Sequence, residues 1–253
     1  MRKSILALAL TLPMLGACAS AQAAEITVYS VGLVGSAFDR IVIDFQKKTG
    51  HTVKTPLPLA NSPLGVILTT MDKEQADIVI LPGSEMPAQA AKYQWGKVRD
   101  IGRVLFSLGM RTADGAAPSI ATEAEFKAAL AGKTVLTNDP VNSLNGRMVK
   151  AVLDRPGFET VRQVSSPGNS ALVFNDRKEA VYVLSVLPEQ LMAAPAVKVA
   201  GQVPASLGLR IDFSGGVLNK AQNPALALEF LNYLTSPEAQ VVWKSGGVAV
   251  PIP

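Results

Sequence analysis

Polar residues suited to binding an anion gather where the sequence pattern changes from strand to helix. Helix amino termini present unpaired N–H groups and about half a positive charge, which favours a negatively charged ligand. Serine and asparagine there can donate to the same ligand, and glycine lets it approach the backbone. We therefore predict an anion site, although Ser62, Ser143 and Ser170 would also suit simple helix capping. The junctions with this composition are Ser30–Ser36, Asn61–Pro63, Asn142–Gly146 and Pro167–Ser170.

Charged residues near these junctions suggest a carboxylate ligand and, as an alternative, proton-transfer chemistry. Arg147 and Arg210 could grip a carboxylate with paired hydrogen bonds. An enzyme that moves a proton next to a carboxylate needs a positioned acid or base, and the candidates are Asp139, Asp212 and Glu85. In the other interpretation the arginines lie on the surface, and the acids are caps, turn residues or solvated charges.

Other kinds of chemistry lack the residues that they need. The single histidine, His51, has no second histidine and no mature-chain cysteine with which to form a metal cluster or a nucleophile–base pair. The sequence also lacks a Gly-x-Ser-x-Gly elbow, a Walker loop and a dinucleotide-binding glycine fingerprint. We therefore expect no metal and no cofactor.

Short apolar strand patterns alternate with amphipathic helical patterns along most of the chain. The helix that starts at Ser36 ends near Gly50, and Thr122 with Glu125 predicts a capping box. This order predicts an α/β fold with a mostly parallel sheet flanked by helices. In such folds, ligands bind beyond the carboxyl ends of the strands. The expected strands are residues 26–29, 52–54, 77–81, 134–137, 161–164 and 180–186, and the expected helices are residues 36–50, 63–71, 86–92, 123–130, 143–154, 170–176, 225–234 and 237–244.

Residues 1–23 have the pattern of an export signal. A basic start is followed by an apolar stretch from Ile5 to Leu15 and by the small-x-small site Ala21-Gln22-Ala23. The segment Leu15-Gly16-Ala17-Cys18 is also similar to a lipoprotein cleavage box, which would make Cys18 a lipid anchor. We expect a periplasmic protein, either released or held at a membrane through Cys18.

Composition excludes several partners. Removing the two basic residues of the leader lowers the formal net charge from +4 to +2, and no Lys/Arg run or basic–aromatic pattern appears. We therefore expect no nucleic acid ligand. With 48% hydrophobic and 17% charged residues, the chain has the composition of a well-packed globular protein.

The order of these motifs resembles the type II periplasmic solute-binding proteins. The leader precedes Ile26-Thr27-Val28-Tyr29, and Ala76-Asp77-Ile78-Val79-Ile80 closes the third strand–helix unit. The segment 231–240, followed by Gly246-Gly247-Val248, is similar to the terminal helices of the molybdate-binding branch. The resemblance implies two α/β lobes, each with a mostly parallel sheet, joined by two crossover strands near residues 103–110 and 209–216. Lobe I would comprise residues 24–104 and 212–253, lobe II residues 105–211, and the lobes would close over a ligand.

The resemblance also implies positions for the ligand site. The first-loop serine of molybdate binders falls at Leu33, close to Ser30 and Ser36, and their late-strand tyrosine falls at about Val186, so hydroxyl donors are missing. Ser30, Gly32 and Leu33 are the expected ligand residues of this loop. The second-loop serine corresponds to Asn61 or Ser62. The remaining expected ligand residues are Asn145, Gly146, Gly168, Asn169, Ser170, Ser84 and Ser214.

Where the chain departs from the molybdate binders, its sequence resembles a subset of secreted homologues that includes an aconitate isomerase. The matching segments are Ser30–Gly35, Ile80–Ser84 and Val248–Pro251. The leading hypothesis is a monomeric binding protein that delivers a molybdate-like oxyanion or an organic carboxylate to the membrane permease of an ABC importer. The alternatives are a periplasmic isomerase of a polycarboxylate and a sensor component that reports to a membrane partner.

Overall fold

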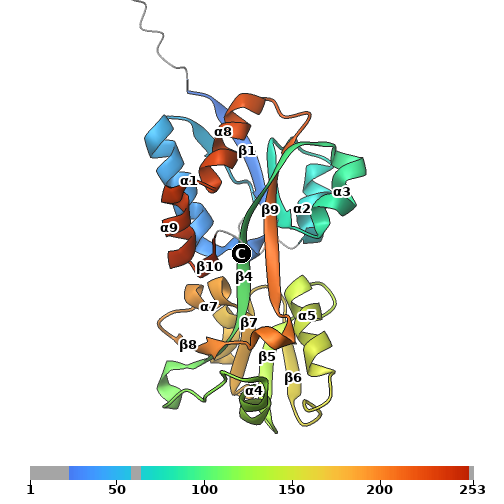
Figure 1. Cartoon of the computed structure of the whole chain (residues 1–253), viewed down its shortest axis with the longest axis vertical. Helices are drawn as coiled ribbons and strands as arrows, with labels where there is room; N and C mark the ends of the chain where they lie inside the picture. Colours follow the sequence, from blue (N-terminus) through green and yellow to red (C-terminus); the bar gives the residue numbers. More distant parts are fainter. Residues whose placement is uncertain (1–22, 58–63, 251–253) are drawn as a thin grey trace, which may run out of the picture.

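The computed structural model describes residues 23–57 and 64–250 of the 253-residue chain. Residues 1–22 of the expected leader, with Cys18, and the expected ligand residues Asn61 and Ser62 lie outside these ranges. Within them, no helix combines the length and apolar character needed to cross a bilayer. The described chain forms two α/β lobes stacked along its long axis (Figure 1).

The first lobe, at the top of Figure 1, contains both ends of the described chain. Its strands β2 (Thr52–Lys54), β1 (Glu25–Ser30) and β3 (Ile78–Pro82) are parallel neighbours in that order. Helix α1 (Gly35–Thr49) buries the predicted apolar face and ends at Gly50, whose φ of 73° closes the helix. The other helices are α2 (Leu64–Met71), α3 (Glu85–Tyr93), α8 (Pro224–Leu234) and α9 (Pro237–Ser245).

Aromatic side chains join the two ends of the chain in the core of this lobe. Trp243 of α9 is fully buried and stacks on Phe38 of α1, with ring centroids 6.4 Å apart. Phe230 of α8 meets Phe38 and Phe45 edge-on. The burial of these large rings fixes α8 and α9 against α1.

The second lobe repeats the pattern with the parallel strands β7 (Tyr182–Val186), β5 (Thr134–Asn138) and β6 (Arg162–Ser166), with β5 between the other two. Helix α4 (Glu123–Leu130) begins with the predicted capping box of Thr122 and Glu125. Helix α5 (Leu144–Leu153) begins after its cap, Ser143. The helix expected over residues 170–176 is α6 (Ser170–Val173), continued by a 3-10 turn over Phe174–Asp176.

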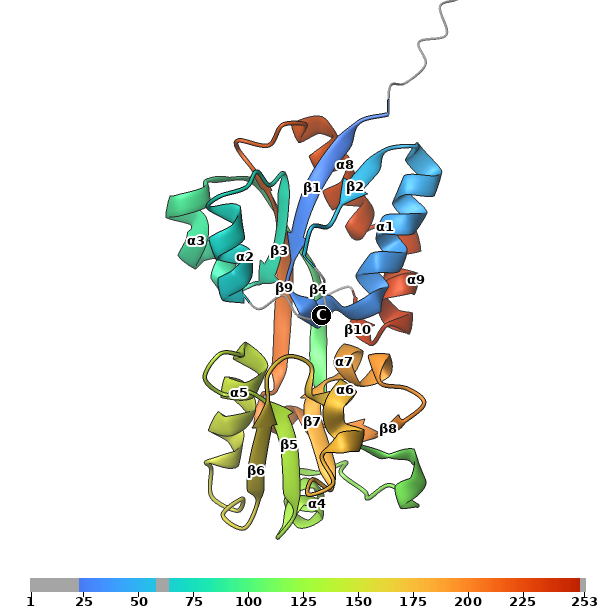
Figure 2. The ribbon, with the colours of Figure 1, turned by 180° about the vertical axis from the view of Figure 1, so that it is seen from behind.

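Two long antiparallel strands, β4 (Trp95–Arg111) and β9 (Arg210–Leu218), run from one lobe to the other (Figure 2). Strand β9 also pairs with β3, and β4 with β7, so one sheet of order β2-β1-β3-β9-β4-β7-β5-β6 passes through both lobes. Strands β1, β2 and β3 are mutually parallel, as are β5, β6 and β7. Strand β9 runs antiparallel to β3 in the first lobe, and β4 runs antiparallel to β7 in the second. The expected lobe boundaries, at residues 104–105 and 211–212, fall within β4 and β9.

Three short elements escaped the sequence analysis. Helix α7 (Leu187–Met192) follows β7 directly and begins with Pro188 in its first turn, but it is too short to show helical periodicity. Strands β8 (Val197–Gln202) and β10 (Val248–Ala249) both pair with β4. Their identity as strands depends on this long-range pairing rather than on an apolar alternation of their own.

Candidate functional site

The strand register directs the predicted junctions of both lobes into one cleft. Pro82, the last residue of β3, pairs with Phe213, which lies nearer to the second lobe than the other β9 partners of β3. Val186, the last residue of β7, pairs with Phe106, which lies nearer to the first lobe than the other β4 partners of β7. Because β1 is parallel to β3, and β5 and β6 run parallel to β7, the carboxyl ends of these strands face each other (Figures 1 and 2).

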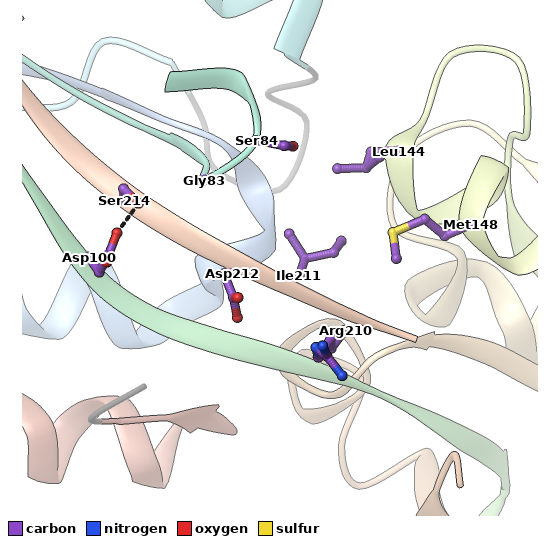
Figure 3. A pocket seen from close by; sticks show the side chains of 9 residues that line it. All are labelled: Gly83, Ser84, Asp100, Leu144, Met148, Arg210, Ile211, Asp212 and Ser214. Atoms are coloured by element: carbon purple, nitrogen blue, oxygen red, sulfur yellow. Dashed lines mark hydrogen bonds between the residues drawn. The ribbon is translucent and has the colours of Figure 1, made fainter. Parts of the chain in front are cut away.

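A cavity of about 430 Å³ opens in this cleft, where the β3–α3 junction and α5 approach β9 (Figure 3). It brings together four residues of the predicted set, namely Ser84, Arg210, Asp212 and Ser214. Its full lining is Gly83, Ser84, Asp100, Leu144, Met148, Arg210, Ile211, Asp212 and Ser214. Both lobes and both crossover strands therefore contribute to one concave site, the common form of a small-molecule pocket.

The remaining first-lobe candidates lie near the cleft but do not line this cavity. The hydroxyl of Ser30 is buried and donates to the carbonyl of Val31 at 3.3 Å. Gly32 and Leu33 belong to a 3-10 turn, η1 (Gly32–Val34), directly before α1. Glu85 is the first residue of α3 and follows Ser84 of the cavity wall.

In the second lobe, a buried carboxylate that the sequence analysis missed organises the predicted donors. Glu189 of α7 accepts from the Nδ2 of Asn145 at 3.1 Å and from the Nδ2 of Asn138 at 3.3 Å. The Nδ2 of Asn169 donates to the backbone carbonyl of Glu189 at 3.3 Å. The hydroxyl of Ser170 donates to the Oδ1 of Asn138 at 3.3 Å. The three predicted side chains thus belong to an internal network under the cleft.

Burial raises the pKa of Glu189 to about 7, because desolvation penalises the charged carboxylate more than the two asparagine amides stabilise it. The only hint in the sequence was a proline–glutamate pair placed directly after a buried strand. A strand end is where functional residues gather in such folds. The burial itself arises from elements far apart in the chain.

Two predicted glycines hold the backbone of this region close together. A side chain at Gly146 would place its Cβ 2.5 Å from the carbonyl oxygen of Asn138, which no real side chain tolerates. Gly168 adopts a φ of 68°, and its carbonyl accepts from the Nδ2 of Asn138 at 2.7 Å. Glycine at position 146 therefore allows the tight turn of the β5–α5 junction, and the carbonyl of Gly168 joins the β6–α6 junction to it through Asn138.

Two of the candidate acids are already engaged. Asp212 forms a two-point ion pair with Arg103, with Oδ2 3.1 Å from Nη2. Asp139 accepts from the backbone N–H of Val141 and the side-chain amide of Asn142, and these bonds hold its pKa below the ordinary value. Asp139 is thus a turn residue, as in the alternative interpretation, and does not line the cavity, whereas the ion pair of Asp212 was not among the predicted roles.

The two candidate carboxylate clamps lie in different surroundings. Arg147 is exposed on α5, and its Nη1 donates to the carbonyl of Val141 at 3.2 Å, outside the cavity lining. Arg210 begins β9 and lines the cavity. Of the two predicted clamps, only Arg210 is therefore placed to meet a ligand there. Among the described residues, no cluster of metal-ligating side chains occurs.

The lobes also touch each other beside the cleft. A Cβ built on Gly35, at the start of α1, would lie 3.0 Å from the Cβ of Pro188 in α7. A Cβ built on Gly247, which has a φ of 82°, would lie closest to the side chains of Leu187 and Leu191 in α7. The missed helix α7 thus supports the buried network on one side and meets the first lobe on the other.

Comparison with known proteins gives this geometry a family context. The family model described as bacterial extracellular solute-binding protein matches residues 26–249. No curated protein gives a significant sequence match. Among solved structures, the substrate-binding domain of a putative molybdenum ABC transporter from Clostridium difficile is similar over 91% of this chain and 100% of its own, with a TM-score of 0.71 and 13% identity.

Two further structures share the fold at low identity. The periplasmic molybdate-binding protein of Azotobacter vinelandii covers 90% of this chain and 100% of its own, with a TM-score of 0.68 and 17% identity. The tungstate ABC transporter structure from Geobacter sulfurreducens covers 87% of this chain and 98% of its own, with a TM-score of 0.64 and 16% identity. At these identities the likeness concerns the two-lobe architecture.

Proposed function

The chain belongs to the family of bacterial extracellular solute-binding proteins, and from this premise we propose that it captures a small anion in the cleft between its lobes for an ABC importer. The anion is an oxyanion of the molybdate type or an organic carboxylate. Capture brings the lobes together, and a membrane permease then receives the ligand. The protein acts as a monomer, and a lipid on Cys18 anchors it to a membrane if that residue is processed.

The observation that carries this proposal is the convergence of strand-to-helix junctions from both lobes on one cavity. The β3–α3 junction contributes Ser84, the amino terminus of α5 contributes Leu144, and β9 contributes Arg210 and Ser214. The amino terminus of α5, the hydroxyl of Ser84 and the guanidinium of Arg210 all favour negative charge. The similar structures include a molybdate-binding protein at 17% identity and a tungstate ABC transporter at 16% identity, which supports an anionic ligand.

The proposal favours binding over isomerisation because of the state of the candidate acids. A proton-transfer catalyst needs a carboxyl group that can gain and lose a proton at its working pH. Asp139 is held ionised by its turn, and Asp212 is paired with Arg103. Glu85 lies beside the cavity wall and is the remaining candidate of the predicted set.

Thermal unfolding of the processed protein with added anions tests the proposal. Molybdate, tungstate, sulfate, cis-aconitate and trans-aconitate are the probes, and at least one should raise the Tm in a concentration-dependent way. A Ser84→Ala/Ser214→Ala double variant should reduce that shift, whereas Ser245→Ala on α9, outside the cavity lining, should not. No shift with any anion would refute the proposal.

The same samples separate binding from catalysis. Incubation with each aconitate isomer, followed by chromatography, should return only the isomer that was added. Interconversion that is lost in Glu85→Gln would instead establish the isomerase alternative. Native mass spectrometry of the purified protein would identify any small molecule that is carried along from the cell.

A further inference from the structure

The cleft cavity has an apolar side as well as a polar one. Leu144 and Met148 lie four residues apart on α5 and therefore occupy one face of the helix. Together with Ile211 of β9, which is only 5% exposed, they project into the same space from two elements (Figure 3). Apolar side chains of this kind gain nothing from a hydrated inorganic ion, but they favour a hydrocarbon group.

The size of the cavity agrees with an organic ligand. Its volume of about 430 Å³ falls within the range of roughly 300–1,000 Å³ that is typical of pockets for organic molecules. One water molecule has a share of about 30 Å³ in the liquid, and a four-oxygen ion fills the space of only a few waters. In the described arrangement of the lobes, such an ion would leave most of the cavity to solvent.

The charges along the cavity disfavour a dianion. The lining contains the carboxylates of Asp100 and Asp212 and one cation, Arg210. Arg103 forms an ion pair with Asp212, while Asp100 accepts from the hydroxyl of Ser214 at 2.7 Å and has no ion-pair partner among the described residues. Arg103 and Arg210 already balance the two aspartates, so one ligand carboxylate that pairs with Arg210 leaves a net charge of −1 at the site. A second negative charge would be repelled by Asp100.

The second lobe offers few side-chain donors to an oxyanion. The amides of Asn138 and Asn145 donate to the carboxylate of Glu189, and the amide of Asn169 donates to its backbone carbonyl. These three amides are therefore engaged within the protein, and none of them lines the cavity.

We propose that the ligand is an organic monocarboxylate with a hydrocarbon chain. Its carboxylate binds at Arg210, and its chain lies against Leu144, Met148 and Ile211. This inference rests on the proposed function, because it specifies which anion the cleft captures. It assigns Arg210 to charge recognition and the α5 face to recognition of chain length.

Calorimetric titration of the processed protein with acetate, butyrate and hexanoate tests the proposal, with molybdate as the inorganic comparison. Affinity should rise about fourfold for each added methylene, since each buried CH₂ contributes about 0.8 kcal/mol. Hexanoate should bind more tightly than molybdate. An affinity that does not change with chain length would overturn the inference, and this series requires no variant.

Variants locate the two parts of the ligand. Met148→Ser should weaken hexanoate binding about tenfold and leave acetate binding unchanged, whereas Arg210→Gln should weaken both. Val241→Ser, at a 69% exposed position on α9, is the control for an apolar-to-polar change outside the cleft. Equal loss of acetate and hexanoate binding in Met148→Ser would contradict the assigned role of the α5 face.

The outcomes distinguish this inference from the function on which it rests. Tight molybdate binding with no binding of any carboxylate would overturn the monocarboxylate inference and leave the proposed anion-capture function intact. Absence of binding for molybdate and for all three carboxylates would overturn the inference. If the wider set of anions also failed to bind, the proposed function would fall with it.

Discussion

Asp212 and Arg103 form a two-point ion pair that joins the crossover strands between the lobes. They are direct partners in the β4–β9 register, with Nε 2.5 Å from Oδ1 and Nη2 3.1 Å from Oδ2. Asp212 immediately precedes the part of β9 that pairs with β3, and Arg103 precedes the part of β4 that pairs with β7. The pair therefore lies where the chain passes from one lobe to the other, and it links the crossover strands β4 and β9.

Removal of one charge from this pair should weaken the fold modestly. Asp212→Asn should lower the free energy of unfolding by about 0.5–1 kcal/mol, because the aspartate side chain is 42% exposed and solvent screens the attraction. Urea unfolding at neutral pH provides the measurement. Asp154→Asn breaks an exposed pair with Lys150 within α5 and should cost no more than about 0.5 kcal/mol.

Asp77 should matter far more for stability than any acid near the cleft. It is 3% exposed, and its carboxylate accepts from the backbone N–H of Thr27 at 2.8 Å and of Gln222 at 2.6 Å. Asp77→Ala would leave these donors without a partner and should cost about 2–4 kcal/mol in urea unfolding. Asp44→Ala, on the exposed side of α1, should change stability by less than about 0.5 kcal/mol. A similar loss in both variants would contradict the role assigned to Asp77.

A methyl group at Gly146 should disrupt the second lobe and the cleft together. Its Cβ would clash with the backbone carbonyl of Asn138, which cannot move without breaking the β5–α5 junction. Gly146→Ala should therefore cost more than about 2 kcal/mol, measured by thermal unfolding. Gly65→Ala on α2 is the control, because no described atom lies within 4 Å of the new Cβ. This variant should raise the free energy of unfolding by up to about 1 kcal/mol. Unchanged stability in Gly146→Ala would show that the junction can relax.

Glu189 should make the stability fall as the pH rises through neutrality. Its pKa is about 7 in the folded protein and near 4.5 in the unfolded chain, so the folded state binds the extra proton between these values. The stabilisation is fully present below pH 4.5 and is lost as the pH rises through 7. The difference amounts to about 3 kcal/mol.

The measurement for Glu189 is the pH dependence of unfolding between pH 4.5 and 8, compared in the native protein and in Glu189→Gln. The variant should lack the decline, whatever its absolute stability, because glutamine does not titrate. Glu179→Gln is the control, since the pKa of Glu179 is lowered by hydrogen bonds and by Arg177. That residue contributes stability above pH 4.5 that is lost on acidification, which is the opposite sign. Identical pH profiles in the native protein and Glu189→Gln would contradict the buried, proton-binding state.

Local patterns were enough to predict most of the fold. The apolar face of α1, the glycine that ends it and the capping box of Thr122 and Glu125 are all set within one or two helical turns. Their physical causes act between neighbours in sequence, so the sequence displays them directly. The order of strands and helices then predicted an α/β protein with ligand-binding junctions at its strand ends, and the resemblance to type II solute-binding proteins implied two lobes.

The contents of the cleft depend on contacts that no local pattern records. The short helix α7 has no periodicity, yet it supplies Glu189, whose amide partners Asn138 and Asn145 lie 51 and 44 residues away. The ion pair of Arg103 with Asp212 spans 109 residues. Burial, and with it the pKa of Glu189 and the apolar side of the cavity, exists only after distant elements have packed. The sequence by itself therefore determined the architecture and the edge at which a ligand binds, while the tertiary structure decided which side chains remain to meet that ligand.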